Sequence, residues 1–109
     1  MSTLPLFDLQ EATSKFGSEQ HAQSMQLAFL ETLPAHKLEL INNLDQNDIT
    51  ETRLLLHKML GAAVYCGVPK LTFLLQKLQK EIHANSPDCL NNLDVLSLVA
   101  CIEEMLNHA

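Results

Sequence analysis

Apolar side chains recur at helical spacing along most of this chain. Between residues 18 and 44 they form one stripe, made of Met25, Phe29, Leu33, Leu40 and Leu44. Residues spaced in this way lie on one face of an α-helix. Pro34 lies inside the stripe and should bend the helix, because proline lacks a backbone donor and clashes with the preceding turn. We therefore expect one bent helix from about residue 18 to residue 44.

The segment from Asp48 to about Cys66 predicts another helix. Asp48 can accept hydrogen bonds from backbone N–H groups of the first turn, and Glu51 follows at the spacing of a capping box. The residues expected to face the core share one side of the helical wheel: Thr52, Leu55, Met59, Ala62 and Cys66. His57 falls on the opposite side, so it should face solvent.

Two more periodic segments follow. Pro69 suits the first turn of a helix, whose apolar stripe would be Leu71, Leu74, Leu75, Leu78 and Ile82. Its lysines, Lys70, Lys77 and Lys80, should be solvated. After a turn at residues 85–88, Asp88 or Asn92 could cap a last helix with an apolar stripe of Leu93, Leu96, Val99 or Ala100, and Leu106.

A short helix over residues 7–16 should come first, with Asp8 as its N-cap and Gly17 ending it. The four longer helices are joined by short turns, an arrangement typical of antiparallel neighbours. The sequence therefore predicts an all-α, up-down four-helix bundle with an additional short N-terminal helix. A chain of 109 residues is sufficient for one core, so we expect a single domain over residues 1–109.

Composition supports a helical protein and excludes some other classes. Apolar residues make up 47% of the chain and aromatic residues only 5%, with three glycines. The cysteines, Cys66, Cys89 and Cys101, lack CxxC spacing and indicate reduced thiols rather than disulfides or a zinc site. The first residues lack the basic and apolar regions of a signal peptide, and no apolar run approaches the roughly 18 residues of a membrane span. We expect a cytoplasmic domain, which could also be a piece of a larger membrane-bound chain, without membrane contact by the domain itself.

Charge is unevenly distributed along the chain. The net charge of −6 argues against a nucleic-acid-binding surface. Five of the seven basic residues lie in residues 53–80, which contain no Asp or Glu: Arg53, Lys58, Lys70, Lys77 and Lys80. A basic segment in an acidic protein suggests a site for an anionic group or an acidic partner, and a solvated face with scattered charges is the alternative.

His57 lies within this basic segment, and its surroundings are unusual. Gly61 follows one turn later, although glycine inside a helix costs about 1 kcal/mol relative to alanine. A side chain at position 61 would lie over the imidazole, so its absence should expose the ring to a partner. Leu54, Leu60 and Val64 lie on the same side, and an apolar rim of this kind is typical of a docking surface.

A neutral histidine can accept a phosphoryl group if three conditions are met. One ring nitrogen must be reachable, cations must lie near the phosphoryl oxygens, and the other nitrogen must be held by a hydrogen bond. Gly61 supplies the first condition and Lys58 the second. The basic segment has no carboxylate for a metal and the chain has no phosphate-binding glycine loop, so a partner must bring both the metal and the phosphoryl group.

The other histidines give no sign of a metal site. No two histidines are spaced for metal binding, and no Cys/His cluster occurs. We expect four of them to be ordinary surface residues: His21, His36, His83 and His108.

The stretch His57-Lys58-x-x-Gly61-x(5)-Gly67 resembles the signature of histidine-containing phosphotransfer (HPt) domains. The continuation over residues 63–71, Ala-Val-Tyr-Cys-Gly-Val-Pro-Lys-Leu, resembles the version attached to bacterial hybrid sensor histidine kinases. The resemblance covers nearly the whole chain, including the proline in the long second helix.

The resemblance implies roles for several residues. His57 would be the phosphoacceptor, and Lys58 would contact the phosphoryl group. A glutamine on the following helix often bonds the imidazole, and the spacing assigns this role to Gln79, with Gln76 as the other candidate. Position 60 is often basic in the family, whereas this chain has Leu60, so docking should depend more on the apolar rim with Gly61 at its centre.

The resemblance also implies a function. The domain would be a phosphorelay intermediate rather than an enzyme, taking a phosphoryl group from a receiver-domain aspartate and passing it to another response regulator. It would have no cofactor of its own, with Mg²⁺ held by the partner receiver. We expect a monomer whose partners are receiver domains, including one within a hybrid sensor kinase.

Two alternatives stay open. One is a helical adaptor module that is never phosphorylated. The other is a dimerisation and phosphoacceptor fragment of a histidine kinase, in which Glu or Asp commonly follows the histidine and a proline comes soon after. Here Lys58 follows His57 and the next proline is Pro69, which fits that fragment poorly.

Overall fold

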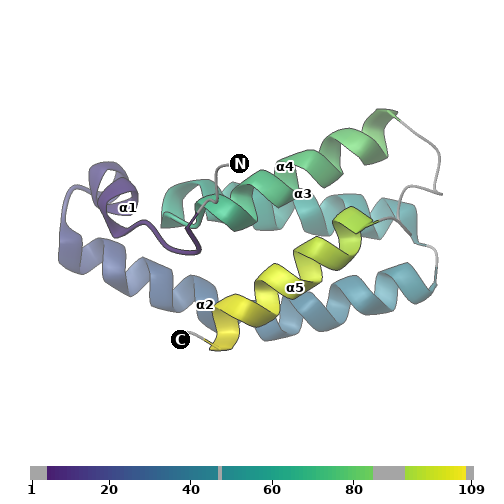
Figure 1. Cartoon of the computed structure of the whole chain (residues 1–109), viewed down its shortest axis with the longest axis horizontal. Coiled ribbons are helices and arrows are strands. Elements are labelled where there is room, and N and C mark those ends of the chain that lie inside the picture. The colour runs from purple at the N-terminus through teal and green to yellow at the C-terminus, as the bar shows by residue number, and fades with distance from the viewer. Residues whose placement is uncertain (1–4, 47, 85–92, 108–109) are drawn as a thin grey trace.

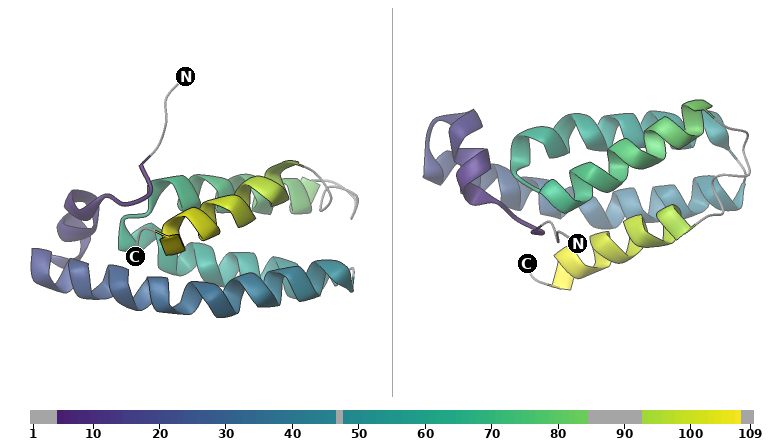
Figure 2. Two further views of the ribbon diagram at one scale, coloured as in Figure 1. Left: turned by 60° about the horizontal axis from the view of Figure 1, so that its bottom comes forward. Right: turned by 45° about the horizontal axis from the view of Figure 1, so that its top comes forward.

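The computed structural model describes residues 5–46, 48–84 and 93–107, and these residues form five α-helices (Figure 1). The helices are α1 (Leu9–Phe16), α2 (Glu19–Asp45), α3 (Ile49–Cys66), α4 (Pro69–Ala84) and α5 (Leu93–Asn107). The helices α2 to α5 pack as an up-down bundle in which each contacts the next and α5 contacts α2. The short helix α1 covers one end of α2 and α3 (Figure 2). This arrangement confirms the predicted fold class.

Side-chain caps fix the beginnings of three helices. The three hydrogen bonds run from Glu11 N–H to Asp8 Oδ1 (3.0 Å), from His21 N–H to Ser18 Oγ (3.1 Å) and from Glu51 N–H to Asp48 Oδ1 (3.1 Å). The first helix begins at Leu9 rather than at Phe7, because the capping residue Asp8 has a non-helical backbone with φ −135° and ψ 89°. The predicted turn at residues 85–88, with Asp88 and Asn92, lies outside the described residues.

The predicted apolar stripe of α2 faces the core. Phe29, Leu33 and Leu40 are buried, and Met25 and Leu44 are partly buried. Pro34 does not interrupt the helix, whose axis curves gently along the bundle (Figure 2). Packing on both sides of the proline is sufficient to keep one continuous helix.

The buried face of α3 is wider than the prediction. Four of the five predicted residues are buried, but Ala62 is exposed, and Leu56 and Ala63 are buried in addition. The reason is that α3 packs against α4 as well as α2. Its buried surface therefore extends towards α4, and the edge that carries Ala62 is left open.

The predictions for α5 and Lys70 also need correction. Leu96 is 65% exposed, and the buried stripe of α5 is formed by Val95, Leu98, Cys101, Ile102 and Met105. Val99 and Leu106 pack partly against the core, whereas Ala100 is exposed. Lys70 is not simply solvated, because its Nζ lies 3.2 Å from Glu104 Oε1 on α5.

The N-terminal segment is bonded to the turn between α3 and α4. The backbone oxygen of Gly67 accepts from Asp8 N–H at 2.7 Å and from Gln26 Nε2 at 3.3 Å, and Lys70 N–H donates to the Pro5 oxygen at 3.2 Å. Gly67 has φ +66°, a left-handed conformation that favours glycine. A Cβ there would also collide with the backbone oxygen of Asp8. The end of α3 is thus held by the N-cap residue of α1 and by α2, and the start of α4 is held by the N-terminal segment.

Candidate functional site

His57 lies in the middle of α3 on the face turned to solvent, and its side chain is exposed as predicted. Gly61, one turn later, is also exposed, and a Cβ built there would meet no atom within 4 Å. Its φ is not positive, so neither backbone conformation nor packing requires a glycine at this position. A Cβ there would also lie more than 4 Å from the imidazole, so it would not cover the ring as expected, and what the glycine provides is an open surface one turn from His57.

The imidazole is held from α4. Gln79 is partly buried there, and its Nε2 lies 3.2 Å from Nδ1 of His57. The two ends of an amide and the two tautomers of an imidazole can be exchanged, so the contact identifies the engaged ring nitrogen and leaves the direction of the bond open. Because Nδ1 is engaged, Nε2 is the ring nitrogen left for an incoming group. Gln76, the other candidate, is exposed.

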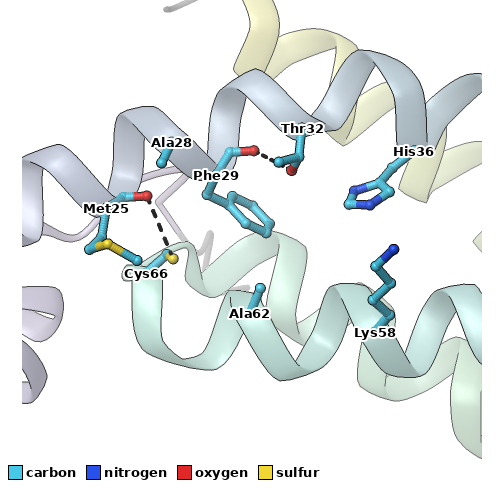
Figure 3. A pocket seen from close by; sticks show the side chains of 8 residues that line it. All are labelled: Met25, Ala28, Phe29, Thr32, His36, Lys58, Ala62 and Cys66. Carbon is cyan, nitrogen blue, oxygen red and sulfur yellow. Dashed lines mark hydrogen bonds between the residues drawn. The ribbon is translucent and has the colours of Figure 1, made fainter.

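Lys58 is exposed and lies on the other side of His57. Adjacent residues are about 100° apart around a helix, so Lys58 lies towards α2 whereas Gln79 approaches from α4. In Figure 3 its ammonium group points towards the ring of His36 on α2. The side chain is long and exposed, so it can adopt other rotamers.

The predicted apolar rim is only partly open. Leu54 is 57% exposed and Val64 is partly exposed, but Leu60 is partly buried and packs against the core. The sequence prediction missed Tyr65, which is 56% exposed and has Lys15 Nζ at 5.7 Å from its ring centroid. Tyr65 follows Gly61 by one helical turn, and this spacing could have identified it.

A cavity of about 370 Å³, open to solvent, lies between α2 and α3 and is lined in part by Lys58, the neighbour of His57 (Figure 3). Its lining residues are Met25, Ala28, Phe29, Thr32, His36, Lys58, Ala62 and Cys66. His36 was predicted to be an ordinary surface residue, but it is partly buried and its Nδ1 has no hydrogen-bond partner among the described residues. Burial lowers the pKa of His36 and the charge of Lys58 lowers it further, while Glu39 acts in the opposite direction.

The described cysteines are buried, free thiols. Burial raises the pKa of Cys66, and it raises the pKa of Cys101 to about 11. Such thiols are poor nucleophiles near neutral pH. Cys89 lies outside the described residues.

Within residues 5–46, 48–84 and 93–107, no three His, Cys, Asp or Glu side chains are placed to hold a metal ion. No helix in the same ranges combines the length and the apolar character needed to cross a membrane.

Comparison with known proteins identifies relatives of the chain. The model of the Hpt domain family matches residues 24–109, a region that contains both His57 and Gln79. The fold is similar to the crystal structure of the HPT domain from the Hpt sensor hybrid histidine kinase from Shewanella. That match has a TM-score of 0.85 and 22% identity, and it covers 94% of this chain and 89% of the other. No curated protein matches the chain significantly.

Proposed function

The chain belongs to the Hpt domain family, a family of phosphorelay phosphotransfer modules rather than kinases, and we propose that His57 is the residue that carries the phosphoryl group. One observation carries the assignment. An exposed histidine has one ring nitrogen held by Gln79, at 3.2 Å, and a glycine one turn away leaves the neighbouring surface open. Positioning one nitrogen while exposing the other is what a nucleophilic imidazole requires.

The proposed reaction exchanges one phosphorus–oxygen bond for a phosphorus–nitrogen bond. The lone pair of His57 Nε2 attacks the phosphorus of a phosphorylated aspartate on a receiver domain, and the electron pair of the broken bond returns to the aspartate carboxylate. For Nε2 to have a free lone pair, Nδ1 must carry the proton. Gln79 then accepts a hydrogen bond from Nδ1–H through Oε1, once its side-chain amide has flipped. The ring is positively charged after the attack until this proton leaves.

Lys58 and the apolar rim supply the other contacts in this proposal. An ammonium group that swings to the phosphoryl oxygens offsets their charge through a charge-assisted hydrogen bond. Leu54, Val64 and the exposed part of Leu60 offer apolar area to a partner, with Gly61 between them. Tyr65 extends this area towards α1.

Hpt domains interact with receiver domains in phosphorelays, and we propose specific partners for this one. The donor is a receiver aspartate, including one within a hybrid sensor kinase, and the acceptor is a second response regulator. The Mg²⁺ of the reaction belongs to the receiver, and the domain binds no cofactor, nucleic acid or membrane. It acts in the cytoplasm as a monomer, either alone or as part of a longer sensor kinase. The hydrogen bonds from Asp8 N–H to the Gly67 oxygen and from Lys70 N–H to the Pro5 oxygen support counting α1 as part of the same domain.

The substitution His57→Gln tests the phosphoacceptor. Receiver domains carrying labelled phosphate on aspartate are mixed with the chain, and transfer of acid-labile, base-stable label is followed. We expect the wild type to become labelled and His57→Gln to stay unlabelled, with an unchanged circular dichroism spectrum. His21→Gln, which removes another exposed histidine, should be labelled like the wild type.

The same measurements separate the alternatives. Label on His57→Gln at the wild-type level would refute the assignment of His57. A wild-type chain that binds receivers but takes up no label would favour the adaptor module. Sedimentation tests the kinase fragment, because that fragment would be an obligate dimer.

A further inference from the structure

The cavity between α2 and α3 has a chemistry that the proposed phosphotransfer does not use. Most of its wall is apolar, including Met25, Phe29 and Ala62. Its nitrogen-bearing side chains, His36 and Lys58, lie together at the end away from Met25 and point towards each other (Figure 3). The cavity therefore has an apolar part and a part that offers hydrogen-bond donors.

The polar groups of the apolar part already have partners. The Thr32 hydroxyl donates to the Phe29 oxygen at 2.6 Å, and Cys66 Sγ lies 3.9 Å from the Met25 oxygen. His36 differs, because its Nδ1 is buried and has no partner among the described residues. A buried polar atom without a partner is unfavourable, so a ligand that supplies the missing hydrogen bond is favoured at this position.

The charges around the cavity favour an anion. No Asp or Glu lines it, and Lys58 forms no salt bridge with the residues that the structure describes. Glu39, on the turn after His36, opposes a negative charge, but its effect on the pKa of His36 is smaller than that of Lys58. An ammonium group beside an imidazole N–H is a suitable pair of donors for a carboxylate.

We propose that this cavity binds a small apolar carboxylate. The carboxylate lies between Lys58 and His36, and the hydrocarbon part extends along Phe29 towards Met25. The volume of about 370 Å³ is near the lower limit of small-molecule sites, roughly 300–1,000 Å³. A medium-length fatty acid such as octanoate is therefore a suitable probe.

Binding would also affect phosphotransfer, a consequence that rests on the proposed function. Lys58 follows His57 directly and belongs to both sites. A carboxylate that holds its ammonium group beside α2 withdraws it from the phosphoryl oxygens on Nε2. Bound ligand should therefore slow phosphoryl transfer without touching the imidazole.

Titration of the whole unphosphorylated chain, followed by NMR, tests the site. We expect octanoate to shift the signals of Met25, Ala28 and Ala62 saturably, with a Kd in the millimolar range. It should also raise the pKa measured from the His36 ring signals, because a bound anion favours the charged ring. Octanol, which lacks the charge, and acetate, which lacks the chain, should each bind at least tenfold more weakly.

Two variants complete the test. Lys58→Gln should weaken octanoate binding severalfold, and Ala62→Leu, at an exposed position, should fill the cavity and abolish binding while the chain stays folded. His57→Gln should bind octanoate like the wild type, so loss of phosphorylation and loss of ligand binding are separate results. Octanoate shifts that do not saturate, equal binding of octanol, or wild-type binding by Ala62→Leu would each overturn the proposal. Burial of Met25 and Ala28 by a receiver domain, without octanoate binding, would also overturn it in favour of protein docking.

Discussion

Gly61 lowers the intrinsic stability of α3 and keeps the histidine accessible. A Cβ at this position would meet no atom within 4 Å, so alanine fits there without strain. We predict that Gly61→Ala raises the free energy of unfolding by up to about 1 kcal/mol, because alanine is the better helix former. We also predict slower phosphoryl transfer, because the methyl group occupies part of the open surface one turn from His57. Urea denaturation and transfer rates measure the two effects on the same sample.

A neighbouring position provides the control for Gly61. Ala62→Gly makes the reverse change at another exposed residue of α3, and it should cost about as much stability while leaving transfer nearly unchanged. Gly61→Glu should reduce transfer further than Gly61→Ala, since it adds bulk and a negative charge. Wild-type transfer by Gly61→Ala would show that the missing side chain is not needed for access.

We predict that Gln79 affects the rate of phosphoryl transfer and has little effect on the stability of the fold. Gln79→Ala removes the contact at 3.2 Å to His57 Nδ1, so both tautomers of the ring become accessible and a smaller fraction is ready for attack. We expect transfer to slow about tenfold, while the stability changes by less than about 0.5 kcal/mol, as is usual near the surface. Gln76→Ala, on an exposed part of the same helix, is the matched control. Equal rates for the two variants would remove Gln79 from the site.

The spacing of residues along single helices allowed much of this site to be predicted. His57 and Gly61 are one turn apart on α3, and the contact between Gln79 and His57 Nδ1 agrees with the position that the family resemblance assigned to the glutamine. His36 could not be predicted, because its surroundings depend on how α2 rotates against α3. Periodicity alone does not fix that rotation.

The turn between α3 and α4 is the most constrained connection described in this fold. Gly67→Ala should lower the free energy of unfolding by roughly 2 kcal/mol or more, because φ is +66° and the new Cβ would meet the backbone oxygen of Asp8 and lie 2.9 Å from Ala12 Cβ. Gly17→Ala is the matched control, since Gly17 has φ +81° but nothing within 4 Å. It should cost only the backbone strain, roughly 1–2 kcal/mol. If both variants lose the same stability, the contact with Asp8 contributes little.

Helix ends were easier to predict from sequence than helix faces. Asp8 and Asp48 act within one turn of their own helix, so local sequence is sufficient to identify them as caps. Ala62 and Leu96 were assigned to the core but are exposed, because a helix in a bundle has two neighbours at an angle that its own sequence does not specify. If the predicted orientation of a helix is wrong by one residue, a side chain at the edge of the apolar stripe is placed in the core when it lies on the surface, or the reverse.

The charge of the whole molecule is less uneven than the sequence suggests. The α5 helix brings acidic side chains to basic ones, with Lys37 Nζ 3.0 Å from Glu103 Oε2 and Lys70 Nζ 3.2 Å from Glu104 Oε1. Lys70 belongs to the acid-free segment, yet α5 offsets its charge. The positive field near His57 therefore depends more on Lys58 than the count of basic residues indicates.

Stability of the whole chain should depend on pH through His36. Its pKa in the folded state lies below the usual 6.5, first because of burial and then because of Lys58. Below pH 6.5 the unfolded chain binds this proton more readily, so the free energy of unfolding should fall as the pH drops towards the lower, folded-state pKa. Well above pH 6.5 the ring is neutral in both states, and its contribution to stability is constant.

Urea denaturation at pH 5.0 and 7.5 measures this dependence. We expect the free energy of unfolding to fall further from pH 7.5 to pH 5.0 in the wild type than in His36→Gln. His21→Gln, which removes an exposed histidine, is the reference. The same loss in His36→Gln and the wild type would mean that His36 does not carry the effect.

The amide of Gln79 also bears on how long the phosphoryl group is stored. Once Nε2 is phosphorylated and the ring has lost its proton, Nδ1 becomes an acceptor, and Gln79 can donate to it through the Nε2 that lies 3.2 Å away. A phosphorylated imidazole releases its phosphoryl group more readily when its other nitrogen is protonated. The amide can pair with Nδ1 in either state, whereas a carboxylate can only accept and so favours the protonated ring. We therefore expect Gln79→Glu to shorten the lifetime of phosphohistidine relative to the wild type. The side chain that prepares His57 for attack would thus also set how long the signal persists between the two receivers.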